Sequence, residues 1–162
     1  MSTQHAQTPG VQEATPTTNG VTILARIKPG QVDAVRAAVT ERAKTWATPD
    51  NPLSKTAKVH FLRFTILDNN TLLFASHFDG DLDDYLDDFF TMSNGGEGFD
   101  DYFRHCEGWP GIGDQQKFVN FWKSHAVENI VLYSYYPGVT CKEIEKALRI
   151  RRNLEAVLQD FQ

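Results

Sequence analysis

The segment 58–90 constrains the fold of this chain most strongly, because it combines two apolar stretches with an acidic one. Residues 59–67 and 72–78 are rich in β-branched and aromatic side chains, which is typical of strands. The Asp-Asn-Asn sequence at 68–70 tolerates the left-handed backbone of a tight turn. Asp81 is a suitable N-cap for a helix that reaches Phe90. The segment therefore predicts a β-hairpin that leads directly into a helix.

The length of the hairpin loop decides which side chains share a face of the sheet. With a three-residue loop, one face is nearly all apolar and packs against helices, while the other carries Arg63 and His77 together. A two-residue loop would place His60 beside His77 instead. We expect the first register, in which His60 is a hydrogen-bonded strand histidine.

The rest of the chain adds further elements to this hairpin. Residues 1–19 have almost no large apolar side chain and predict a disordered tail, whereas residues 20–162 predict a single domain. Thr140 and Glu143 match a capping box at the start of a terminal helix. Hydrophobic periodicity and turn residues predict the other elements. These are strands over 21–28 and 129–136, and helices over 31–47, 98–105 and about 114–125.

This order predicts an α+β fold of the ferredoxin-like βαββαβ type. Its four-stranded antiparallel sheet has helices on one face, with extra helices before the last strand and at the C-terminus. The second face is only partly polar and needs a cover. A second copy of the chain is the simplest one, so we expect a homodimer through the open sheet face.

Composition argues against several kinds of partner. A formal net charge of −5 opposes binding to DNA or RNA. The N-terminal residues do not resemble a leader, and no segment has the apolar length of a membrane span. Cys106 and Cys141 have neither disulfide-scaffold nor metal-knuckle spacing, and predict free thiols in a reducing compartment. We therefore expect a cytoplasmic protein without nucleic-acid or membrane partners.

Local spacing predicts no metal site. The five histidines form no HxH, HxxxH or HExxH motif. The acidic run 79–90 has Asp84 and Phe90 where a calcium loop needs Gly and Glu, so it predicts a solvated helix face. Ligands that come together from distant strands remain possible.

Candidate ligand-binding residues lie on the predicted strands and loops. Arg63 and His77 could together bind a carboxylate or phenolate, or position a general base. Tyr133 and Trp109 could line an aromatic pocket. His105 could ligate a haem iron, with His77 as the other candidate. No catalytic residue is assigned, and no cofactor is predicted apart from haem as the alternative.

The segments HFLRFTILDNNTLLFASHFDGDLDDYLDDF, HCEGWPG and VLYSYYPGVTCKEI resemble an uncharacterised bacterial family of the dimeric α/β barrel superfamily. The resemblance covers roughly residues 20–155. Relatives in that superfamily include antibiotic-biosynthesis monooxygenases, chlorite dismutases and dye-decolourising peroxidases, which bind aromatic substrates or haem between sheet and helices. The resemblance implies the fold and dimerisation, and function only by analogy.

Three functions therefore stay open, and the sequence does not decide whether a reaction is catalysed. The first is a dimer that binds a small apolar or aromatic molecule, with a cofactor-independent oxygenase as its catalytic form. The second is a haem-binding protein or peroxidase-like relative. The third is a non-catalytic dimerisation or interaction module.

Overall fold

A computed structural model describes residues 18–46, 48 and 51–159 of the chain. Its sheet is four-stranded, with the order β2-β3-β1-β4 and antiparallel pairing throughout. This topology confirms the predicted ferredoxin-like α+β fold. The strands are β1 (Thr18–Arg26), β2 (Val59–Leu67), β3 (Thr71–Asp79) and β4 (Ala126–Val127). Most of the predicted tail lies outside the described residues, and residues 18 and 19 belong to β1.

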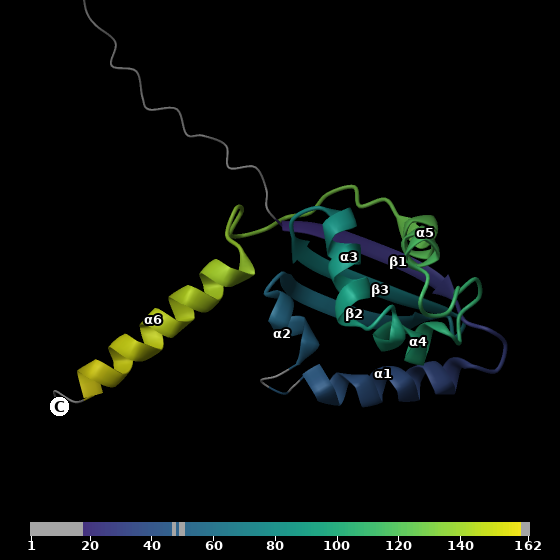
Figure 1. Ribbon diagram of the computed structural model, residues 1–162, viewed down its shortest axis with the longest axis horizontal. Helices are drawn as coiled ribbons and strands as arrows, with labels where there is room; N and C mark the ends of the chain where they lie inside the picture. The colour runs from purple at the N-terminus through teal and green to yellow at the C-terminus, as the bar shows by residue number, and fades with distance from the viewer. Residues whose placement is uncertain (1–17, 47, 49–50, 160–162) are drawn as a thin grey trace, which may run out of the picture.

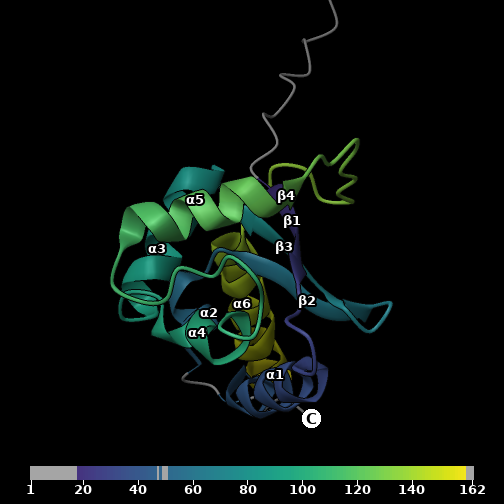
Figure 2. The ribbon, with the colours of Figure 1, turned by 90° about the vertical axis from the view of Figure 1, so that its right-hand side faces the viewer.

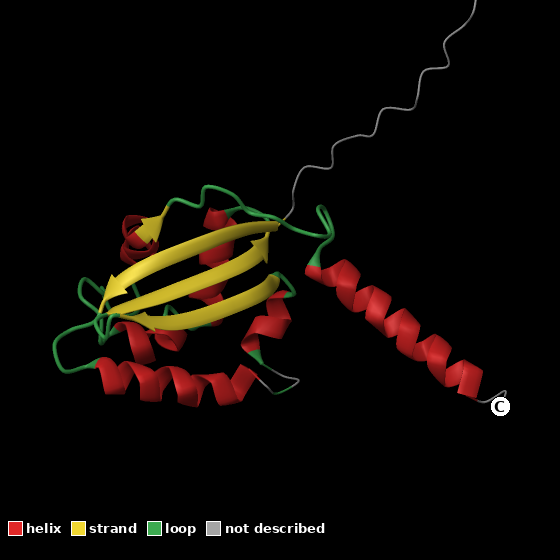
Figure 3. Cartoon of the chain, turned by 180° about the vertical axis from the view of Figure 1, so that it is seen from behind, coloured by secondary structure: helices red, strands yellow, loops and turns green. Residues whose placement is uncertain are grey.

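Except for the C-terminal helix, the helices gather on one side of the sheet, as predicted. Figure 3 shows the three long strands with no helix in front of them, and Figure 1 shows α3 and α4 across the opposite face. The helices are α1 (Val32–Trp46), α2 (Pro52–Thr56), α3 (Leu82–Met92), α4 (Glu97–Phe103), α5 (Gln115–His125) and α6 (Cys141–Gln159). The second sheet face is therefore open within the described part of the chain (Figure 2).

Aromatic rings fill the space between sheet and helices. The indole of Trp122 on α5 lies 4.8 Å from the ring of Phe74 on β3, between ring centroids. Phe99 and Phe103 on α4 contact the same indole at 5.4 and 5.7 Å. These side chains are buried, so most of the aromatic surplus of the sequence forms the core.

The hairpin has the register expected for a three-residue loop. Arg63 pairs with Ala75 and Phe61 with His77, so Arg63 and His77 share the open face. Asp68 and Asn69 adopt positive φ angles of 48° and 53°, as the turn requires. A bulge between Val59 and Phe61 interrupts the ladder at residue 60, and such a bulge changes the direction of a side chain.

The predicted fourth strand over 129–136 is wrong. Strand β4 contains only Ala126 and Val127, which pair with Ile23 and Thr22 of β1. Beyond it, the Asn129 side chain donates to the Gly20 carbonyl over 2.7 Å, so a side chain replaces the backbone ladder there. The following residues are exposed, including Ile130 at 94%. A Cβ atom at Gly20 would lie 3.7 Å from Leu132 Cδ2, so the segment approaches β1 at Leu132, but most of it does not pack on the pleated surface that strand propensity expresses.

Helix α6 extends away from the rest of the chain (Figures 1 and 3). The predicted capping box is present: the Glu143 N–H donates to Thr140 Oγ1 over 3.2 Å, and the Thr140 N–H donates to Glu143 Oε2 over 2.8 Å. Leu148 and Leu154 of its apolar stripe are exposed. No helix in the described ranges is long and apolar enough to cross a membrane.

Candidate functional site

A cavity of about 500 Å3 lies between the sheet and helices α1, α3 and α4. Its volume falls in the range of about 300–1,000 Å3 that small-molecule sites occupy. Apolar side chains from several elements form much of its wall: Trp46, Leu53, Leu62, Phe89, Met92, Phe99 and Ile112. The polar part of the wall is made by Arg42, Thr45, Ser93, Asn94, Asp100, Asp101 and Tyr102, with Gly98. The cavity can therefore enclose an apolar body and orient a polar end.

The turn between α3 and α4 shapes one side of this cavity. Ser93 ends α3, where its hydroxyl donates to the Phe89 carbonyl over 2.6 Å and accepts from the Gly96 N–H over 3.1 Å. Gly95 and Gly96 have φ angles of 74° and 99°, which favour glycine. The chain can therefore reverse within four residues and start α4 beside α1.

Arg42 is the one cation among the described residues that line the cavity. Its Nε donates to the Gly98 carbonyl over 3.3 Å, and its Nη2 lies 3.8 Å from Asp101 Oδ2. A Cβ atom at residue 98 would lie 2.7 Å from Arg42 Nη2, so glycine leaves the room that the guanidinium occupies. The side chain is 29% exposed, and its planar group can donate to a bound carboxylate or phenolate.

The acidic side chains at the cavity already have partners. Asp100 Oδ1 accepts from Trp109 Nε1 over 2.8 Å, and Asp101 lies beside Arg42. Burial raises the pKa of the Tyr102 phenol well above its usual value. Tyr102 is therefore neutral at ordinary pH and is not a base.

Arg63 and His77 do not line this cavity, because they lie on the open face of the sheet. Partial burial lowers the pKa of His77, and the charges of Arg63 and His60 lower it further. A Cβ atom at residue 20 would lie 3.3 Å from His77 Cδ2, so Gly20 on the neighbouring strand makes room for the ring. This pair can bind an anion only on the open face.

The structure does not bring Trp109 and Tyr133 to Arg63 and His77. Trp109 packs in the aromatic cluster, 5.4 Å from the Phe103 ring and 5.0 Å from the Phe121 ring between centroids. Tyr133 lies in the segment after β4 and is 79% exposed. The four predicted ligand residues therefore lie in three places, and their role in binding stays a prediction.

His105 borders a second, shallower space of about 430 Å3 between α1 and α4. Its Nδ1 lies 2.9 Å from Gln31 Oε1, and burial together with Arg104 and Lys28 lowers its pKa. Most residues of the wall are of charged or polar type, and no large apolar or aromatic side chain joins them among the described lining residues: Glu41, Arg42, Thr45, Asp101 and Arg104, beside Ala34 and Ala38. Such a wall fits the large apolar face of a haem poorly. The haem alternative stays a prediction for which haem titration is the test.

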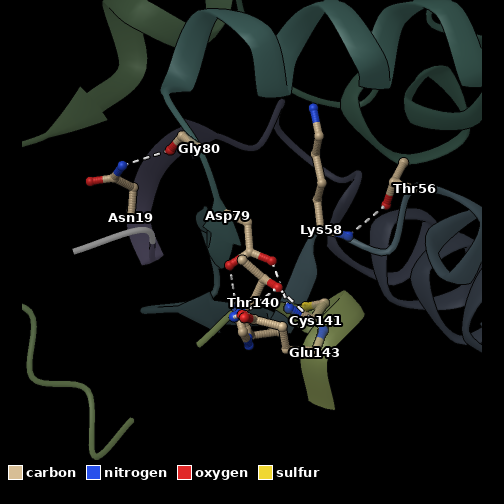
Figure 4. A network of polar contacts seen from close by, with 9 residues as sticks. Asn19, Thr56, Lys58, Asp79, Gly80, Thr140, Cys141 and Glu143 are labelled. Atoms are coloured by element: carbon tan, nitrogen blue, oxygen red, sulfur yellow. Dashed lines mark hydrogen bonds and ion pairs between the residues drawn. The ribbon is translucent and has the colours of Figure 1, made fainter. Parts of the chain in front are cut away.

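A further cluster joins the sheet to the start of α6. His60 Nε2 lies 2.7 Å from Asp79 Oδ1, which confirms the prediction of a hydrogen-bonded strand histidine. The Cys141 N–H donates to Asp79 Oδ2 over 2.7 Å. Figure 4 shows Asp79 beside Thr140 and Cys141. Burial and the adjacent Asp79 carboxylate raise the pKa of the Cys141 thiol to about 12, so the free thiol is a poor nucleophile.

The sequence contains a signal for Arg42. Arg42 falls on the apolar stripe of α1, between Val39 and Trp46, where a charged residue needs a partner or a function. The cluster of His60, Asp79 and Cys141 has no comparable signal, because its members are far apart in the sequence.

Comparisons with known proteins add little. No family model and no curated protein matches the chain, so the resemblance to a dimeric α/β barrel family stays a prediction. One similar solved structure is tetracenomycin F2 cyclase from Streptomyces glaucescens, described as a type-II polyketide cyclase. It is 15% identical, with a TM-score of 0.44, and the match covers 73% of this chain and 97% of that one. That level of similarity supports no conclusion about the function of this chain.

Proposed function

We propose that the cavity between sheet and helices binds a small, largely apolar or aromatic molecule that carries one anionic or phenolic group. The observation that supports this proposal is that Arg42 is the single cation among the described residues of the cavity wall, which has many apolar side chains. A ligand ring would contact groups such as Trp46 and Leu62, and its polar end would accept from the guanidinium. Arg42 would then exchange part of its contact with Asp101 for the ligand.

Binding of 2-naphthoate and of uncharged 2-naphthol, compared by titration calorimetry, tests this proposal. Arg42→Gln should weaken binding of naphthoate by about 10-fold or more, because a charge-assisted hydrogen bond contributes about 1.5–3 kcal/mol. Binding of naphthol should change much less. Arg36→Gln, an exposed position on the same helix, is the matched control and should change neither.

Two outcomes contradict the proposed cavity. Equal affinities of the two probes for Arg42→Gln and the unchanged protein would remove Arg42 as the anion-binding group. Loss of naphthoate binding in Arg63→Ala with His77→Ala, but not in Arg42→Gln, would place the ligand on the open face. Melting curves of each variant show whether the fold is kept.

A cofactor-independent oxygenase is the finer form of this proposal. In such a reaction a deprotonated aromatic substrate gives electrons to O2, so the site has to bind a phenolate and exclude water. Arg42 could favour the phenolate, because its charge stabilises the ionised form. Oxygen consumption with a polycyclic phenol is the measurement. A rate equal to that of heat-denatured protein would remove the oxygenase and leave the binding proposal intact.

The second proposal concerns the open sheet face, which we infer is covered by a second copy of the chain. Apolar side chains on that face support it, above all Phe61, which is 74% exposed. If no small molecule binds, this face is the basis of the remaining alternative, a non-catalytic dimerisation module.

A further inference from the structure

Three potential metal ligands meet where the hairpin and α6 come together. His60 belongs to β2, Asp79 ends β3, and Cys141 begins α6. One ligand atom of each residue lies within 4.8 Å of the other two. The side chains of His60 and Asp79 are only 12% and 11% exposed, so this group is not a loose surface cluster.

The backbone around these residues orients them toward one another. The bulge in β2 occurs at residue 60, where it changes the direction of the imidazole. The Cys141 N–H holds one oxygen of the Asp79 carboxylate, and the other oxygen faces His60. Figure 4 shows this carboxylate against the first residues of α6, with Thr140 and Glu143 beside it. Much of the ordering that a metal site requires is therefore already present.

The donor atoms identify the kind of ion. Calcium and magnesium take oxygen ligands, whereas an imidazole nitrogen, a thiolate sulfur and a carboxylate oxygen together suit zinc. Tetrahedral zinc bonds of about 2.0–2.3 Å place ligand atoms roughly 3–4 Å apart, so small side-chain movements suffice. We propose that His60, Asp79 and Cys141 bind one zinc ion, with a fourth position open to water.

Binding would replace the contact between His60 and Asp79 by two bonds to the ion. The Cys141 thiol would lose its proton to solvent as the zinc–sulfur bond forms, so one proton is released for each ion bound. The ion would also link the start of α6 to β2 and β3. Such a link matters because the rest of α6 is exposed within the described chain.

Titration of the reduced, metal-free full chain with cobalt chloride is the first test. Cobalt in a thiolate site gives sulfur-to-metal charge-transfer absorption, and a tetrahedral site gives visible bands. We expect one equivalent to bind, with both signals, and zinc chloride to displace it. Cys141→Ser should abolish the charge-transfer band, and His60→Gln should weaken binding by at least about 10-fold.

Matched controls use the other cysteine and another histidine. Cys106→Ala and His105→Gln should keep both the cobalt spectrum and the affinity, because neither residue belongs to the cluster. Asp79→Asn leaves one acceptor oxygen where the carboxylate has two, one beside His60 and one beside the Cys141 N–H, so circular dichroism accompanies that variant. Cys141→Ser and His60→Gln leave the Asp79 carboxylate in place, so these two variants decide the test.

Zinc should also protect the Cys141 thiol from a thiol-reactive dye in the unchanged protein, and do so less in His60→Gln. The proposal is overturned if cobalt gives no charge-transfer band, or if the band survives in Cys141→Ser. It is also overturned if His60→Gln and His105→Gln bind with equal affinity.

Discussion

The hydroxyls of Ser76 and Tyr85 are buried in the core and lie 2.5 Å apart. They differ in whether each would keep another hydrogen-bond partner if the other hydroxyl were removed. Ser76 Oγ also lies 3.3 Å from the Phe61 carbonyl, to which it donates. Burial raises the pKa of Tyr85 far above its usual value, so the phenol stays neutral and needs a hydrogen-bond partner. Removing each hydroxyl separately should therefore destabilise the fold by different amounts.

We expect Ser76→Ala to destabilise the fold by about 1–3 kcal/mol, because the Tyr85 hydroxyl then has no partner. Tyr85→Phe should cost only about 1 kcal/mol, because Ser76 retains the Phe61 carbonyl and the ring still stacks on Phe78. Urea unfolding of the three proteins measures both values. The reverse order of stabilities would contradict this description of the pair.

Protonation of His77 makes the stability of the fold depend on pH. Its pKa in the folded chain is lowered by burial, by Arg63 and by His60, below an ordinary value of about 6.5. The unfolded chain therefore binds a proton more readily, so stability is complete above pH about 6.5 and falls as the pH decreases through the folded pKa. Arg63→Gln should raise the pKa of His77, measured by NMR titration of its ring proton. An unchanged value would show that Arg63 does not act on His77.

The sequence predicts which side chains lie next to each other in some cases and not in others. Arg63 and His77 share a face because strand alternation and a three-residue loop are local properties. Arg42 meets Asp101 only after α1 packs against α4, and no sequence pattern sets that distance. For the same reason Trp109, a plausible pocket residue by type, forms part of the aromatic core.

The start of α3 shows how one side chain stabilises an element. Asp81 Oδ1 accepts from the Asp84 N–H over 2.9 Å, and this bond lowers the pKa of Asp81. We expect Asp81→Ala to lower the melting temperature by about 2–4 °C, whereas Asp81→Asn keeps an acceptor and most of the stability. Because the folded pKa is depressed, the contribution is present above pH about 4 and is lost as the pH falls further. A melting temperature for Asp81→Ala equal to that of Asp81→Asn would exclude the cap.

Hydrophobic periodicity predicts some helices and strands of this chain correctly and others incorrectly. The hairpin, α1, α3 and α5 are found close to their expected positions, because each buries one regular apolar face. The segment 129–136 has the residues of a strand but forms none, because an edge strand requires a partner surface as well as propensity. The apolar side chains of this segment and the apolar stripe of α6 remain exposed in the described chain.

For the molecule as a whole, the open sheet face predicts self-association. Phe61, Leu67, Leu24 and Val127 expose apolar area there, and the described chain does not cover them. We expect light scattering at micromolar concentration to give a mass of about twice 18.3 kDa. A stable interface buries about 1,200–2,000 Å2, which needs a substantial part of this face rather than one residue.

Phe61→Arg should shift this dimer to the monomer, because a charge at the centre of an apolar contact has to be desolvated without a partner. Thr40→Arg adds the same charge on the helical side and should leave the dimer intact. Leu148→Arg distinguishes the open sheet face from the apolar stripe of α6 as the dimer contact. If Leu148→Arg dissociates the dimer and Phe61→Arg does not, the contact lies on α6. A monomer in the unchanged protein would remove the second copy as the cover. Arg63 and His77 would then be the first residues of the open face to test for a different partner.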